Sequence, residues 1–201
     1  MDFAERIKRN ADRLRAMRPT RLAPTASIRV ELDAGEWSAG DPGERLAHLC
    51  RACLAALGAD PIPAATYDGH KGLAQAKQAR LRVGVAGGRG WSEVRQGSDM
   101  AALAAQLSQA GQQALVPGPG LELVDLSESG VTDWRGSLVR PQTARLVLVG
   151  PQWLAVRPGQ ATGVRQAFGL AMDYDQRILD ATRAVGFLDA LRHHLMEGGG
   201  G

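Results

Sequence analysis

The chain has 201 residues, 24 Lys and Arg against 21 Asp and Glu, a formal net charge of +3, 44% hydrophobic residues and 22% charged residues. These values are typical of a globular protein with one core, and charges mixed along the chain give no concentrated basic face for nucleic acid. No apolar run reaches the roughly 18 residues of a membrane-spanning helix and no signal-peptide pattern begins the chain, so the sequence predicts a cytoplasmic protein with no membrane or nucleic-acid partner.

The first half of the chain predicts helices and strands in alternation. Residues 2–17 show the spacing of an amphipathic helix, whose basic side chains could be a weak basic patch or a solvated face. A strand is expected over 26–33, a helix over 44–57, and a loop containing His70 over 67–72. The next strand covers 81–85 and runs into glycines 87–90, which indicate a flexible strand exit rather than a phosphate loop because no P-loop lysine accompanies them.

Two cysteines, Cys50 and Cys53, form a C-x-x-C pattern within the expected helix 44–57. One such pair without a second pair or a nearby His set is weak evidence for metal or redox chemistry. The cysteines also continue a helical apolar stripe with four leucines (Leu46, Leu49, Leu54 and Leu57). We therefore expect both thiols to pack in the core and no metal site there.

The second half predicts a helix that ends near 114, strands over 121–127 and 146–150, and then a last strand and helix. Apolar residues alternate from Val164 to Met172, and from Asp180 the spacing changes to that of a helix. This order predicts a two-layer α/β fold with a mixed sheet covered by helices. We expect one domain over 1–197 and a flexible glycine tail over 198–201.

The junction between that last strand and helix carries a family resemblance. The run Asp175-Gln176-Arg177-Ile178-Leu179-Asp180-Ala181 is similar to the Asp-His-Arg-x-x-Asp-Gly signature of the dihydrolipoyl acyltransferase catalytic domain, a relative of chloramphenicol acetyltransferase. Residues 24–33, 124–130 and 138–150 resemble further segments of that family in the same order. The resemblance implies a chloramphenicol acetyltransferase-like fold over nearly the whole chain.

The resemblance also implies roles for three residues. Ser127 matches the family's serine, whose hydroxyl stabilises the oxyanion formed when a thioester is attacked, and Asp180 matches an acid that is structural or orients neighbouring groups. Gln176 occupies the position of the catalytic histidine. The family implies homotrimers with active sites between subunits, so that Ser127 and Gln176 meet across chains, and it implies a coenzyme A or acyl-carrier-protein thioester as substrate with no bound cofactor.

Gln176 changes the expected chemistry, because a carboxamide orients an acceptor by hydrogen bonds but does not take its proton at neutral pH. His70 is the candidate substitute base, while His48 reads as a helix residue, and His193 and His194 read as a solvated helix end. Asp175 and Asp180 would need raised pKa values, and the family uses the first of them as a structural ion-pair partner. A family Gly-Leu-x-x-Pro-Val-Ile run is replaced here by residues 90–94, which contain no proline.

Two readings of function follow. The first is an atypical acyltransferase that moves an acyl group from a coenzyme A or carrier-protein thioester to a small-molecule hydroxyl or amine, using Ser127, Gln176 and Asp180. The second is an inactive homologue that keeps the trimeric core as a scaffold or binding module, as the loss of the histidine and the closing glycine suggests. A third possibility, that glutamine was introduced deliberately to disable the enzyme, is disfavoured by Ala181 and by the missing Pro-Val segment, which indicate natural divergence.

Overall fold

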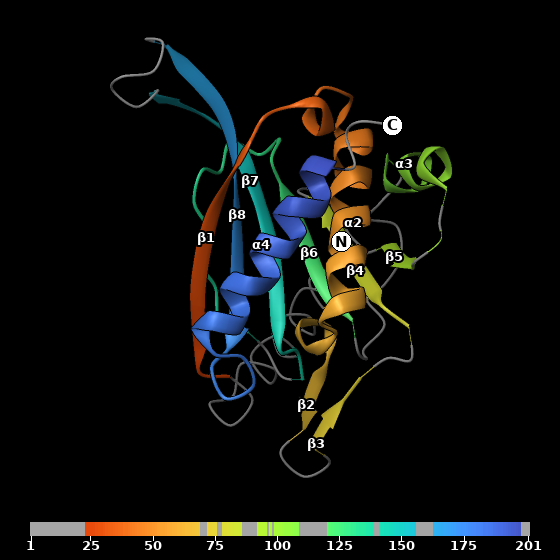
Figure 1. Cartoon of the computed structure of the whole chain (residues 1–201), viewed down its shortest axis with the longest axis vertical. Helices are drawn as coiled ribbons and strands as arrows, with labels where there is room; N and C mark the ends of the chain where they lie inside the picture. The colour runs from red at the N-terminus through yellow and green to blue at the C-terminus, as the bar shows by residue number, and fades with distance from the viewer. Residues whose placement is uncertain are drawn as a thin grey trace, which may run out of the picture.

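The computed structural model describes residues 23–68, 72–75, 78–85, 92–95, 97, 99–108, 120–138, 141–155 and 163–197. In these ranges a six-stranded sheet has the strand order β1-β8-β7-β6-β4-β5, and the helices lie over one of its faces (Figure 1). Its strands are β1 (Thr25–Asp33), β4 (Arg80–Val85), β5 (Ser92–Arg95), β6 (Leu121–Leu126), β7 (Ala144–Ala155) and β8 (Val164–Asp175). The helices are α2 (Pro42–Ala59), α3 (Met100–Ser108) and α4 (Ala181–Glu197).

The sheet is mixed, as the sequence predicts. Strands β4, β6 and β7 run parallel to one another, whereas β8 is antiparallel to both β7 and β1, and β5 is antiparallel to β4. With helices on one face only, the described residues form a two-layer α/β structure, which confirms the expected fold class.

Helix α2 forms where the sequence places a strong start signal. Asp41 is the N-cap, and its carboxylate accepts the Glu44 backbone N–H at 2.9 Å. The Glu44 carboxylate in turn accepts the Asp41 backbone N–H, which completes a capping box. Pro42 occupies the first turn, where its missing N–H costs nothing. Cys50 and Cys53 are free thiols and fully buried in the main core, so the prediction that they are packing residues is confirmed.

Strand β8 and helix α4 supply much of the core. Alternate side chains of β8 point to the helices, and Leu170 and Met172 are completely buried. Helix α4 buries one face against them through Ala184, Phe187, Leu188, Leu191 and Leu195. The predicted change from strand to helix spacing near Asp180 is therefore confirmed.

The second face of the sheet carries a charged row that crosses strand after strand. Paired positions link Ser27 to Asp173, Asp173 to Arg145, Arg145 to Glu122, and Glu122 to Arg82. The Asp173 carboxylate accepts hydrogen bonds from Ser27 Oγ at 2.5 Å and Arg145 Nη2 at 2.6 Å, and Arg82 Nη2 lies 3.4 Å from Glu122 Oε1. Burial raises the pKa of the Glu122 carboxyl, although Arg82 and Arg145 oppose that shift.

Several predicted boundaries are wrong. The segment expected to be a loop from Tyr67 holds a two-stranded sheet, β2 (Thr66–Asp68) with β3 (Gly72–Ala74), because the Tyr67 N–H pairs with the Pro141 carbonyl at 2.7 Å and anchors the first strand. Strand β5 was not expected, since four residues are too few for a periodic signal. Strand β7 is longer than the predicted 146–150, because a bulge at Gly150 lets it continue past Pro151.

Other predictions fall outside the described ranges: the helix over 2–17, His70, the glycine run 87–90, the end of the helix near 114, and the tail 198–201. Within the described ranges, no helix combines the length and apolar character that crossing a membrane requires.

Candidate functional site

Ser127 lies directly after β6, in the turn of residues 127–130. Its backbone N–H donates to the buried Asp125 carboxylate at 2.9 Å, which ties the turn to the strand that precedes it. The residue is 4% exposed, so little water reaches the hydroxyl and hydrogen bonds there are stronger than in bulk solvent.

Gly150 holds the Ser127 turn from the neighbouring strand. A Cβ at position 150 would lie 2.8 Å from the Ser127 carbonyl oxygen and 3.4 Å from the Val131 carbonyl oxygen. Gly150 is also the extra residue of the β7 bulge, and its N–H donates to the Val131 carbonyl at 2.9 Å. The absence of a side chain therefore allows β7 and the Ser127 turn to approach closely.

Arg45, in the first turn of α2, reaches the Ser127 hydroxyl. Its Nη2 donates to Ser127 Oγ at 3.2 Å and also pairs with the Glu128 carboxylate. The Arg45 guanidinium lies over the Phe168 ring, 5.1 Å from its centroid, and the residue is 7% exposed. Ser127 is thus in contact with a buried positive charge.

Gln176 lies in the turn that follows β8, far from Ser127. Its backbone N–H donates to the Pro24 carbonyl at 3.0 Å, and the residue is exposed. Within the described ranges its side chain makes no hydrogen bond.

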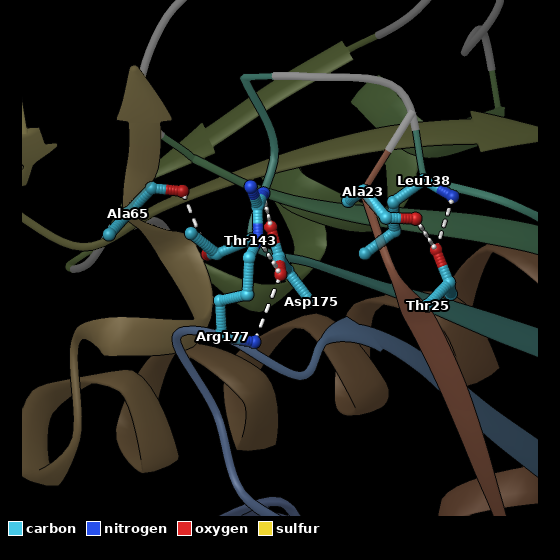
Figure 2. A network of polar contacts seen from close by, with 7 residues as sticks. All are labelled: Ala23, Thr25, Ala65, Leu138, Thr143, Asp175 and Arg177. Atoms are coloured by element: carbon cyan, nitrogen blue, oxygen red, sulfur yellow. Dashed lines mark hydrogen bonds and ion pairs between the residues drawn. The ribbon is translucent and has the colours of Figure 1, made fainter. Parts of the chain in front are cut away.

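A network of polar contacts around the buried residues Thr143 and Asp175 fixes that turn (Figure 2). The Asp175 carboxylate is completely buried; it accepts the Arg177 backbone N–H at 3.1 Å and Arg177 Nε at 2.9 Å, and it also pairs with Arg177 Nη2. The Asp175 N–H donates to the Thr143 carbonyl at 2.8 Å, and the Arg177 guanidinium lies over Tyr67, 5.1 Å from its ring centroid. These contacts give Asp175 the structural ion-pair role that the family resemblance implies.

Asp180 is the N-cap of α4. It is exposed, and its Oδ1 accepts the Arg183 backbone N–H at 2.7 Å while its carbonyl accepts the Ala184 N–H at 3.0 Å. Arg183 in turn forms a two-bond ion pair with Asp60 at the end of α2, with both distances 2.7 Å. Asp180 therefore orients the start of the helix that follows Gln176.

Within one chain, the Gln176–Asp180 turn lies beside the start of β7, whereas Ser127 lies beside the middle of that strand. Leu126, just before Ser127, is paired with Val149, whereas Asp175, just before Gln176, bonds to Thr143. Six residues of extended strand separate Thr143 from Val149, a span of about 20 Å. The structure thus brings Gln176 and Asp180 together and leaves Ser127 apart from both.

The described histidines lie elsewhere. His48 is a half-buried residue of α2, and burial followed by the nearby Arg51 lowers the pKa of its imidazole. His193 and His194 are at the end of α4, where His193 Nε2 lies 3.1 Å from a Glu197 carboxylate oxygen, as expected for a helix end in solvent. In the part of the chain that the structure describes, no group of three or more His, Cys, Asp or Glu residues could hold a metal ion.

Sequence reasoning missed Arg45. It is 82 positions from Ser127, and a single arginine in the first turn of a helix reads as solvated. No local pattern would have identified it, because the contact depends on how α2 packs across the end of β6.

The chain was compared with known protein families, curated proteins and solved structures. No family model and no curated protein matches the sequence. A probable dihydrolipoamide acetyltransferase from Listeria monocytogenes is 19% identical with a TM-score of 0.77, over 98% of this chain and 93% of that one. The dihydrolipoamide acetyltransferase of Azotobacter vinelandii is 19% identical (TM-score 0.73, 94% and 87% covered), and chloramphenicol acetyltransferase is 14% identical (TM-score 0.62, 94% of both). The chain therefore has the acetyltransferase fold that its resemblance predicts.

Proposed function

We propose that this protein is an atypical acyltransferase that moves an acyl group from a coenzyme A or carrier-protein thioester to a small-molecule hydroxyl or amine. The observation that carries the proposal is the Ser127 hydroxyl, which accepts a hydrogen bond from Arg45 at the end of β6, in a fold shared with acetyltransferases over 94% or more of the chain. For the Azotobacter enzyme, a serine, a histidine and an asparagine four residues after it have been studied in the catalytic mechanism. Ser127, Gln176 and Asp180 have the same order and a similar spacing.

The proposed step needs no bound cofactor. The acceptor oxygen or nitrogen attacks the thioester carbonyl carbon, and the carbonyl electron pair moves onto oxygen, where Ser127 O–H donates a hydrogen bond to the resulting oxyanion. When the carbonyl reforms, the carbon–sulfur bond breaks and the thiolate leaves. The proton lost by the acceptor ends on the released thiol, so the products are the acylated acceptor and a free thiol.

Gln176 restricts the acceptor. A positioned general base contributes about 10²- to 10⁴-fold in rate, and a carboxamide does not supply that contribution. It can accept a hydrogen bond from the acceptor and orient it. We therefore propose that acceptors already nucleophilic at neutral pH, or with an acidic X–H group, react best.

A second copy of the chain completes the site in this proposal. The separation of about 20 Å between Ser127 and Gln176 is too long for one acceptor and one thioester carbonyl to bridge. A homotrimer in which Ser127 of one subunit faces Gln176 of the next would bring the two together. The Asp175–Arg177 network and the Asp180 cap then hold Gln176 in place from its own subunit.

Calorimetry with acetyl-coenzyme A and with a pantetheine thioester tests the proposal, together with sedimentation to measure the assembly. We expect saturable binding to a trimer, and release of thiol that falls when Ser127→Ala removes the oxyanion donor. The variant Gln176→His should raise the rate with weakly nucleophilic alcohols. No binding at millimolar thioester would refute an acyltransferase and favour the scaffold reading.

A further inference from the structure

The contact between Arg45 and Ser127 carries a further inference, which rests on the proposed function. We infer that Arg45 is the positioning residue for the oxyanion donor: it holds the Ser127 hydroxyl so that its proton points to the substrate oxygen, and its charge makes that proton a stronger hydrogen-bond donor.

The hydrogen-bond inventory of serine supports the orientation. A hydroxyl has one O–H donor and two acceptor lone pairs. Arg45 Nη2 donates to Ser127 Oγ at 3.2 Å and occupies one lone pair, since a guanidinium cannot accept. The Ser127 proton must then point away from Arg45, toward another acceptor.

The charge has a second effect. A hydroxyl that accepts a hydrogen bond from a cation is polarised, so the hydrogen bond that it donates becomes stronger. Ser127 is 4% exposed, and the low dielectric around a buried residue increases this effect. Arg45 itself is 7% exposed, and in the described part of the chain its buried Nε has no hydrogen-bond partner. A buried cation that is incompletely paired is costly by itself, but it is suited to a site where negative charge develops.

Two further side chains contact the Arg45 guanidinium. Phe168 packs under the guanidinium at 5.1 Å, and Glu128, whose side chain is 61% exposed, pairs with the same Nη2. Because Glu128 is largely solvated, its charge is screened and neutralises Arg45 only in part. Glu128 therefore provides a matched control: Glu128→Gln removes the ion pair and leaves the Arg45–Ser127 bond intact.

A double-mutant cycle tests the inference with acetyl-coenzyme A as donor and hydroxylamine as acceptor, since hydroxylamine is nucleophilic at neutral pH without a base. In the unmodified protein, Arg45→Met should lower kcat about tenfold or more and change KM little, because the lost interaction acts on the oxyanion. In the Ser127→Ala background, Arg45→Met should change kcat less than about twofold, because the residue through which Arg45 acts is gone. Arg45→Lys should retain part of the rate, and Glu128→Gln should keep it.

Each outcome is decisive. If Arg45→Met lowers kcat by the same factor with Ser127 present and in the Ser127→Ala background, Arg45 supports the fold and does not act through Ser127. If Arg45→Met leaves kcat unchanged with Ser127 present, Arg45 has no role at the site. Either result overturns the inference and leaves the proposed acyltransferase function standing. No turnover by the unmodified protein would overturn the proposed function and the inference together. Thermal unfolding of each variant checks folding; in Arg45→Met the remaining partner, Glu128, has a side chain that is 61% exposed, so no buried carboxylate is left without its ion pair.

Discussion

Replacing Gly150 with alanine should destabilise the protein through the Ser127 turn. The added Cβ would lie 2.8 Å from the Ser127 carbonyl oxygen, closer than carbon and oxygen normally approach, and it would also meet the Val131 carbonyl at 3.4 Å. Both neighbours are backbone atoms, so no side chain can rotate away, and either β7 or the turn must shift. Such overpacking costs about 1–3 kcal/mol, which for a domain of this size corresponds to a melting temperature lower by about 2–12 °C.

Gly186 in α4 is the matched control. It receives the same methyl group, but nothing lies within 4 Å of the position that its Cβ would take, and the site is exposed. In the middle of a helix, alanine is favoured over glycine by about 0.5–1 kcal/mol, so Gly186→Ala should stabilise. The two variants are compared by urea unfolding at one protomer concentration, because oligomerisation shifts apparent stability.

Opposite signs for the two substitutions are the expected result. If Gly150→Ala matched the unmodified protein within about 0.5 kcal/mol, the close approach between β7 and the Ser127 turn would be refuted. Amide resonances give a second readout, since Ser127 and Glu128 should shift in Gly150→Ala and stay in place in Gly186→Ala.

Three further predictions concern stability and thiol reactivity. Leu148→Ala, at a completely buried position, should lower the unfolding free energy by about 2–5 kcal/mol in urea titrations. The hydrogen bonds from Arg183 lower the pKa of Asp60, so the ionised Asp60 carboxylate stabilises the folded state. Asp60→Asn should therefore lower the unfolding free energy by its full amount above the ordinary aspartate pKa of about 3.9, and this difference should disappear as pH falls through the lower pKa of the folded state. Urea unfolding at pH 7 and at pH 2.5 measures the difference. Burial raises the pKa of both the Cys50 and Cys53 thiols, so a disulfide reagent should modify them only after denaturant is added, and rapid modification in buffer would contradict their packing.

The sequence predicts the fold where local pattern and packing agree. Period-two apolar residues mark β8 and an apolar stripe marks α2, because each feature is set by residues a few positions apart. Gly150 and Pro151 read as the end of a strand, yet β7 continues, because the bulge and its pairing with β8 are tertiary features. The same limit applies to the site: Ser127 and Gln176 could be proposed by resemblance, whereas Arg45 depends on a contact between distant elements.

The charged row on the second face of the sheet determines how the strands align. Sliding β7 by two residues along β8 would keep every side chain on its own face, but it would place Val147 opposite Asp173 and leave a completely buried carboxylate without Arg145. An unpaired buried charge costs several kcal/mol, more than a mismatch among valines and leucines. The charged row therefore destabilises any register shifted by two residues between neighbouring strands among β4, β6, β7 and β8. The apolar face alone distinguishes such shifted registers only weakly.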